Sequence, residues 1–199
     1  ETYTIELKYK AAAEGTVSNV FVDMYERKVA QFDELAEKVK EADAIIYVGG
    51  ITPSQEGEGH ERATIELPAV QRRFLQAMHE TGKPVIYVNC SGSCVGFEGI
   101  EHAYDALLQA WYPGQGGAQA LADVLFGDYN PSGKLPVTFY ASNDDLPDFL
   151  DYSMENRTYR YFRGTPLYAF GYGMSYTTFE YGKGKLSKSS MKADGKVTL

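Results

Sequence analysis

The chain has 199 residues, of which 44% are hydrophobic and 23% are charged, and its formal net charge is -8. These values predict a globular protein with one main core and exclude a disordered chain. The acidic balance comes without a long basic run, which argues against a nucleic-acid partner. No apolar stretch reaches the roughly 20 residues that a membrane helix needs, so no membrane segment is expected.

The first half of the chain predicts two strands and two helices. Apolar residues alternate with polar ones over residues 1–10, which is the period of a strand. Apolar residues recur every three or four positions over residues 32–42, which predicts an amphipathic helix leading into a buried strand at 44–48. A second helix is expected over 68–78, because Pro68 suits a first helical turn.

The following elements continue the alternation of strand and helix. Residues 85–88 and 106–111 are short and uniformly apolar, which predicts two interior strands. A third helix is expected over 115–126, closed by a glycine, and an edge strand over 135–140, because its proline cannot donate to a ladder.

This order of elements predicts the fold class α/β, with a mostly parallel sheet that has helices on both faces. Ligands of such sheets gather at the carboxyl ends of the strands. The loops at 49–66, 89–104 and 112–117 should therefore share one edge of the sheet, and any chemistry is expected there.

The loop after the first buried strand contains the stretch SQEGEGHER, residues 54–62. Its glycines permit tight turns, and neighbouring carboxylates can have raised pKa values, as a general acid near neutral pH requires. A solvated acidic loop is the alternative reading of the same pattern.

Other candidate sites are not expected. The two cysteines, Cys90 and Cys94, have no second Cys/His cluster that would complete a tetrahedral metal site. The glycines at 114–117 lack both the dinucleotide-binding spacing and a P-loop Lys-Ser/Thr, which disfavours a flavodoxin-like nucleotide binder. Neither a metal nor a cofactor is predicted.

Several long motifs resemble one family. They are AIIYVGGITPSQEGEGHER (44–62), LPAVQ (67–71), VNCSGS (88–93), LLQAWYPGQGGAQALADVLFGDYNPSGKLPVTF (107–139), RTYRYF (157–162) and FGYGMSYTTFEY (170–181). Together they are similar to the C-terminal α/β sandwich domain of glycoside hydrolase family 3, in its bacterial β-xylosidases and β-glucosidases. The resemblance implies that 30–182 form this domain. Residues 1–29 would be a remnant of a preceding domain and its linker, and 183–199 a linker and the start of a fibronectin type III-like module, with remnant strands at both ends.

The resemblance also implies the site residues. The acid/base of the family commonly lies in a Gly-Glu-Gly-x-Asp-Arg stretch, which here runs from Gly57 to Arg62 and gives the role to Glu58. Glu56 is the alternative acid/base, because related sequences often keep a second acidic residue two positions earlier. Arg62 and His60 would position the substrate or the loop. Glu61 stands where the pattern usually has Asp.

The implied activity is that of an acid/base-bearing domain in a retaining exo-β-glycosidase, which hydrolyses β-xylosides or β-glucosides in plant polysaccharide breakdown. Its substrates would be oligosaccharides or aryl glycosides, and its partner the N-terminal (β/α)8 barrel of a periplasmic or secreted parent enzyme. The barrel would supply the nucleophile, so the isolated chain is expected to be inactive. A non-catalytic carbohydrate-binding or structural module remains the alternative.

Overall fold

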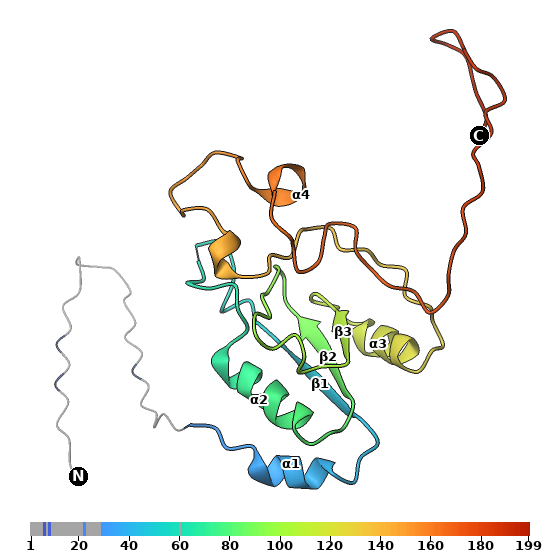
Figure 1. Ribbon diagram of the computed structural model, residues 1–199. Helices are drawn as coiled ribbons and strands as arrows, with labels where there is room; N and C mark the ends of the chain where they lie inside the picture. Colours follow the sequence, from blue (N-terminus) through green and yellow to red (C-terminus); the bar gives the residue numbers. More distant parts are fainter. Residues whose placement is uncertain (1–5, 7, 9–21, 23–28, 60) are drawn as a thin grey trace, which may run out of the picture. The chain divides into compact units, whose positions relative to one another are not determined.

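A computed structural model describes residues 6, 8, 22, 29–59 and 61–199 of the protein (Figure 1). The chain divides into two compact units, Glu1–Gln31 and Phe32–Leu199. Of the expected strand over residues 1–10, the structure describes only Glu6 and Lys8. The second unit contains all the helices and strands that follow.

The second unit is built on a parallel sheet of three strands in the order β1-β2-β3. These strands are β1 (Ile45–Gly50), β2 (Val85–Cys90) and β3 (Ala106–Gln109). Because β1 and β2 run in parallel, the chain must cross over between them, and it does so through α2 (Ala69–His79) (Figure 1). The expected parallel α/β sheet with helices is confirmed.

The helices agree closely with the sequence pattern. The expected helix at 32–42 is α1 (Asp33–Val39), and the one at 115–126 is α3 (Gly117–Leu125). In α2, Pro68 occupies the N-cap. Proline has no backbone N–H, but the N–H groups at the start of a helix have no partner within the helix, so no hydrogen bond is lost there. Two short helices follow, the 3-10 helix η1 (Asn143–Asp145) and α4 (Thr158–Tyr161).

The core lies between α2 and one face of the sheet. Leu75 and Met78 of α2 and Val85 and Tyr87 of β2 are fully buried. The rest of this cluster comes from the strand ends and the loops, namely Ile45, Ile51, Leu67, Val95, Phe97, Ile100 and Ala103. Helix α1 joins it through Phe32, whose ring meets that of Phe74 edge-on at 5.4 Å. The loops that carry the site are therefore anchored in the core at Ile51, Leu67 and Val95.

Three strands differ from the expectation. β1 is not a buried strand, because Ile46 and Val48 are 48% and 60% exposed. β3 ends at Gln109 rather than at 111, because Trp111 has a left-handed backbone (φ 55°) that cannot continue a strand. It is also an edge of the sheet in the described part of the chain, not an interior strand. Residues 135–140 form no regular strand and make only an isolated antiparallel bridge, Phe139 to Tyr168.

Within 183–199 the structure contains neither helix nor strand, and Ser187 and Thr198 are joined by two hydrogen bonds. None of the described helices is long and apolar enough to cross a membrane.

Candidate active site

The three loops at the carboxyl ends of the strands meet at the side chain of Glu56. The N–H of Gly92, after β2, and the hydroxyl of Tyr112, after β3, each lie 2.5 Å from its Oε1. The hydroxyl of Ser93 donates to Oε2. The expectation that these loops share one edge of the sheet is confirmed.

The surroundings of Glu56 favour its charged form. Burial alone raises the pKa of this half-buried carboxyl, but the hydrogen bonds from Ser93, Tyr112 and Gly92, together with the charge of Arg62, bring the pKa below its ordinary value. Burial and the bond to Glu56 in turn raise the pKa of Tyr112, which keeps its hydroxyl protonated as a donor. Glu56 is thus a carboxylate that accepts three hydrogen bonds.

Arg62 holds the far end of the same loop. Its Nη2 donates to the hydroxyl of Ser93 at 3.0 Å and to the carbonyl of Cys94 at 2.9 Å. Ser93 therefore accepts from Arg62 and donates to Glu56, so both ends of the acidic loop are tied to one residue of the next loop. A role of Arg62 in positioning the loop or the substrate stays a prediction.

Glu58 lies between these two anchors and is exposed. Its side chain makes no hydrogen bond or ion pair with the described residues, and Glu61 is likewise exposed. Gly59, next to Glu58, has a left-handed backbone (φ 75°) with open space around it. His60 lies outside the described residues.

A buried polar network supports the loop after β2 from below. Asn89, the buried fifth residue of β2, accepts a hydrogen bond from the hydroxyl of Tyr87 at 3.0 Å. Its amide donates to Ser91 at 3.0 Å and to Gln109 of β3 at 2.6 Å. The hydroxyl of Ser91 then donates to the carbonyl of Ser93 at 2.7 Å. The network connects the core to Ser93.

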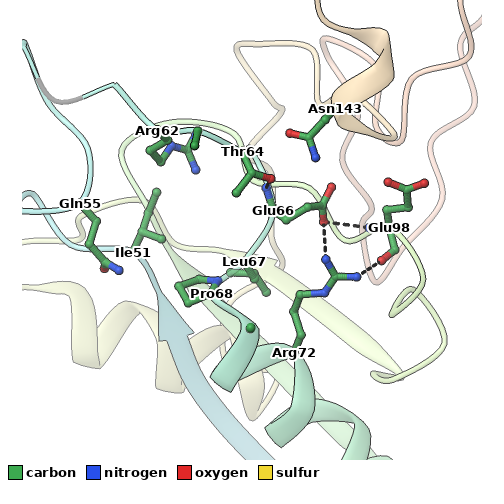
Figure 2. A pocket seen from close by; sticks show the side chains of 12 residues that line it. Ile51, Gln55, Arg62, Thr64, Glu66, Leu67, Pro68, Arg72, Glu98 and Asn143 are labelled. Carbon is green, nitrogen blue, oxygen red and sulfur yellow. Dashed lines mark hydrogen bonds and ion pairs between the residues drawn. The ribbon is translucent and has the colours of Figure 1, made fainter. Parts of the chain in front are cut away.

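A cavity of about 670 Å³ lies beside the acidic loop, between it, the start of α2 and η1 (Figure 2). Glu66 lines it, with only 8% of its side chain exposed, and forms a 3.5 Å ion pair with Arg72. The backbone N–H of Glu98 also donates to Glu66, at 3.2 Å. Burial raises the pKa of Glu66, against the opposing charge of Arg72. Oε1 of Glu66 and Nη1 of Arg62 are buried without a partner in the described part of the chain.

The two cysteines, Cys90 and Cys94, are free and partly buried, and burial raises the pKa of both thiols. Raised pKa values leave little thiolate at neutral pH, so neither has the character of a nucleophile. Across the described residues no group of three or more His, Cys, Asp or Glu side chains could hold a metal ion.

Comparisons with known proteins show similarity to one family of glycoside hydrolases. Residues 3–176 match the family model of the glycosyl hydrolase family 3 C-terminal domain. A xylan 1,4-beta-xylosidase of Xylanibacter ruminicola is 46% identical over 96% of this chain and 23% of the relative. A periplasmic beta-glucosidase of Salmonella typhimurium is 38% identical over 89% of this chain and 26% of the relative.

Solved structures give the same result. A GH3 exo-beta-xylosidase bound to a xylobiose aziridine probe superposes with a TM-score of 0.69 at 34% identity, over 79% of this chain and 21% of that one. A beta-glucosidase from Kluyveromyces marxianus gives a TM-score of 0.70 at 31% identity, over 82% of this chain and 22% of that one. The chain thus spans about a quarter of the length of the proteins it matches.

Proposed function

Because the chain belongs to glycoside hydrolase family 3, as its C-terminal domain, we propose that it carries the acid/base of a retaining exo-β-glycosidase. The carboxyl group is that of Glu58, and the substrates are β-xylosides or β-glucosides from plant polysaccharides. The names of the relatives, xylosidases and glucosidases, support both sugars equally. The observation that carries the proposal is an exposed Glu58 on a loop fixed at the carboxyl edge of the sheet.

The chemistry favours Glu58 over Glu56. A general acid must give a proton to the leaving oxygen, so it needs a carboxyl group that is free to protonate and to reach the substrate. Glu56 accepts three hydrogen bonds that stabilise its anion, and these donors occupy the positions that a leaving group would need. Glu58 has no such partners in the described part of the chain.

A retaining mechanism needs a second carboxylate about 5 to 5.5 Å from the first, which attacks the anomeric carbon while the acid protonates the leaving oxygen. Glu58 would then deprotonate the water that hydrolyses the glycosyl-enzyme intermediate. We assign the nucleophile to a (β/α)8 barrel elsewhere in the parent enzyme, since the relatives are about four times as long as this chain. The isolated chain should therefore be inactive on aryl glycosides.

An exposed apolar surface supports a contact with further polypeptide. Phe149, Leu150 and Tyr152 are 73%, 74% and 88% exposed. Adjacent apolar side chains with this exposure are typical of an interaction surface.

We assign 30–182 to the sandwich domain, and 1–29 and 183–199 to connections with its neighbours. Export of the parent enzyme to the periplasm or medium is supported by the periplasmic relative.

The test uses the full-length parent enzyme with Glu58→Gln and Glu58→Ala, and Glu80→Gln as the control, since Glu80 is exposed at the end of α2. Loss of a general acid should lower kcat by about 100- to 10,000-fold on aryl glycosides with poor leaving groups. The loss should be smaller with activated leaving groups, and azide should restore turnover in Glu58→Ala by forming a glycosyl azide. Unchanged kinetics in both variants would instead favour a non-catalytic module.

A further inference from the structure

We propose that Glu56 is a positioning residue, whose carboxylate clamps the loop of Glu58 to the loops that follow β2 and β3. The inference rests on the proposed function of Glu58 and assigns Ser93 and Tyr112 as the partners of the clamp. Glu56 does not exchange a proton with the substrate in this scheme. It fixes the place from which Glu58 does so.

The need for a clamp follows from the local backbone. Glu58 has a glycine on each side, and Gly59 adopts a left-handed conformation in open space. Glycines restrict the chain least, so this stretch does not hold Glu58 in one position by itself. A misplacement of about 1 Å can cost a catalytic group on the order of 100-fold in rate. The position of Glu58 must therefore come from the residues on either side.

Glu56 and Arg62 provide these fixed points. Glu56 is the last residue before Glu58 with tertiary hydrogen bonds, and Arg62 is the first described residue after it that has them. Both contact Ser93, whose hydroxyl accepts from Arg62 and donates to Glu56. Glu58 thus lies between two anchors that both contact Ser93.

The donors around Glu56 favour a carboxylate over an amide. Oε1 accepts from Gly92 and Tyr112, and Oε2 accepts from Ser93, so both oxygens face donors. A glutamine of the same shape would place its NH₂ group against at least one of these donors. Hydrogen bonds to an ionised acceptor are also roughly twice as strong as neutral ones.

The residue before Tyr112 has a strained backbone, and this turn places Tyr112 beside Glu56. This residue, Trp111, has φ 55°, which is costly for a bulky side chain. The indole packs edge-on against Phe139 at 6.3 Å between ring centroids, and Phe139 is buried. This turn ends β3 and brings the hydroxyl of Tyr112 to both Glu56 and the carbonyl of Ile51, at 2.5 Å and 3.2 Å. Strain of this kind is typical of functional sites.

The test is a double-mutant cycle in the full-length parent enzyme, with Glu56→Gln, Glu58→Gln and the combination of the two. Glu56→Gln should lower kcat by roughly 10- to 100-fold and leave KM within about twofold. In the Glu58→Gln background, Glu56→Gln should change kcat by no more than about twofold, because a positioning residue acts only through the group it positions. Azide should not restore turnover in Glu56→Gln, since the carboxylate of Glu58 remains.

Two further variants address folding and the partners of the clamp. Tyr112→Phe removes one donor and leaves the ring in place, and Tyr129→Phe is its control, because Tyr129 is exposed and its hydroxyl is unbonded in the described residues. Tyr112→Phe should lower kcat about threefold to tenfold with a fall of no more than a few degrees in the unfolding temperature, and Tyr129→Phe should change neither.

Each outcome is decisive. An unchanged kcat in Glu56→Gln beside a large loss in Glu58→Gln overturns the clamp alone. If the kcat losses of the two single variants multiply in the double variant, Glu56 has a general structural role, which overturns the clamp as well. Azide rescue of Glu56→Gln would make Glu56 the acid/base itself. An unchanged kcat in Glu58→Gln contradicts the proposed function instead.

Discussion

The hydroxyl of Tyr112 lies 2.5 Å from Oε1 of Glu56, although 56 residues separate the two along the chain. Glu56 follows β1 and Tyr112 follows β3, which are the two outer strands of the sheet. The bond therefore closes the carboxyl edge of the sheet above β2, from which Gly92 and Ser93 also contribute. A carboxylate at this junction makes the stability of the edge depend on pH.

Acid should weaken the hydrogen bonds that Glu56 accepts and so lower the stability of the chain. The pKa of Glu56 is lower in the folded chain than its ordinary value of 4.5, so the contribution of Glu56 to stability is present above about pH 4.5 and is lost as the pH falls through the folded pKa. Glu56→Gln should therefore cost about 1 to 2 kcal/mol at neutral pH and progressively less in acid. Urea denaturation of this chain and the variant, at pH 7 and at about pH 3.5, measures the difference.

The exposed Glu80→Gln is the control, and its unfolding free energy should follow that of the unsubstituted chain at both pH values. A penalty for Glu56→Gln that is the same in acid as at pH 7 would contradict an ionised Glu56 in the folded chain.

Glu66 should show the opposite dependence. Burial raises the pKa of its carboxyl in the folded chain, so its contribution is fully present below the unfolded pKa of about 4.5 and is lost as the pH rises through the folded pKa. Glu66→Gln removes the buried charge and keeps an acceptor for the N–H of Glu98. At pH 7 the variant should be as stable as the unsubstituted chain, or more stable by up to about 2 kcal/mol, because burial disfavours the charged form of Glu66.

Urea denaturation at pH 7 and at about pH 3.5 also checks this prediction. The free energy of unfolding that Glu66→Gln gains at pH 7 should shrink on acidification, as should the loss in Glu56→Gln. A loss of more than about 3 kcal/mol at pH 7 would mean that the ion pair with Arg72 outweighs the cost of burying the charge.

Gly50 should not tolerate a side chain. It ends β1 with φ 124°, and a Cβ there would lie 1.9 Å from the carbonyl oxygen of Cys90 in β2. The side chain of Gln71 also bonds both its N–H and its carbonyl, which fixes this backbone. Gly50→Ala should cost about 3 kcal/mol or more, measured by thermal unfolding. Gly133→Ala, where a Cβ meets open space, should stay within about 0.5 kcal/mol.

Local sequence patterns were sufficient to predict many of the helices and strands. The apolar periodicity of α2 and the proline at its N-cap predicted the helix within a residue, and the uniformly apolar runs predicted β1 and β2. These signals depend on neighbouring residues only, so they can be read directly from the chain. The parallel topology then predicted that the three loops would share one edge.

The partners of Glu56 could not be read in this way. They lie 36, 37 and 56 residues away, and their pairing depends on the register of the sheet. Local signals were also misleading at Trp111, because an aromatic residue after an apolar run favours a longer strand. Its backbone is left-handed, and its side chain packs on Phe139, which is distant in the sequence. The sequence thus offered two glutamates for one role, and among the described residues only Glu56 has long-range side-chain hydrogen bonds.

Asn89 provides a last prediction, because it joins the core to the site. Its amide is fully buried and bonds Tyr87, Ser91 and Gln109. Asn89→Ala leaves the hydroxyl of Tyr87 without this acceptor and opens a small cavity, so it should cost about 2 to 4 kcal/mol. Gln119→Ala, which removes only an exposed bond to Asp123, should stay within about 0.5 kcal/mol.

In the parent enzyme Asn89→Ala should also release Ser93, since the bond from Ser91 to the carbonyl of Ser93 is the next in the network. Amide hydrogen exchange of the full-length protein measures this directly. The amide of Gly92, which donates to Glu56, should exchange faster in Asn89→Ala, because the loop opens locally more often. If the variant lost stability while this amide kept its protection, the buried network would stabilise the core without fixing the loop that holds Glu56.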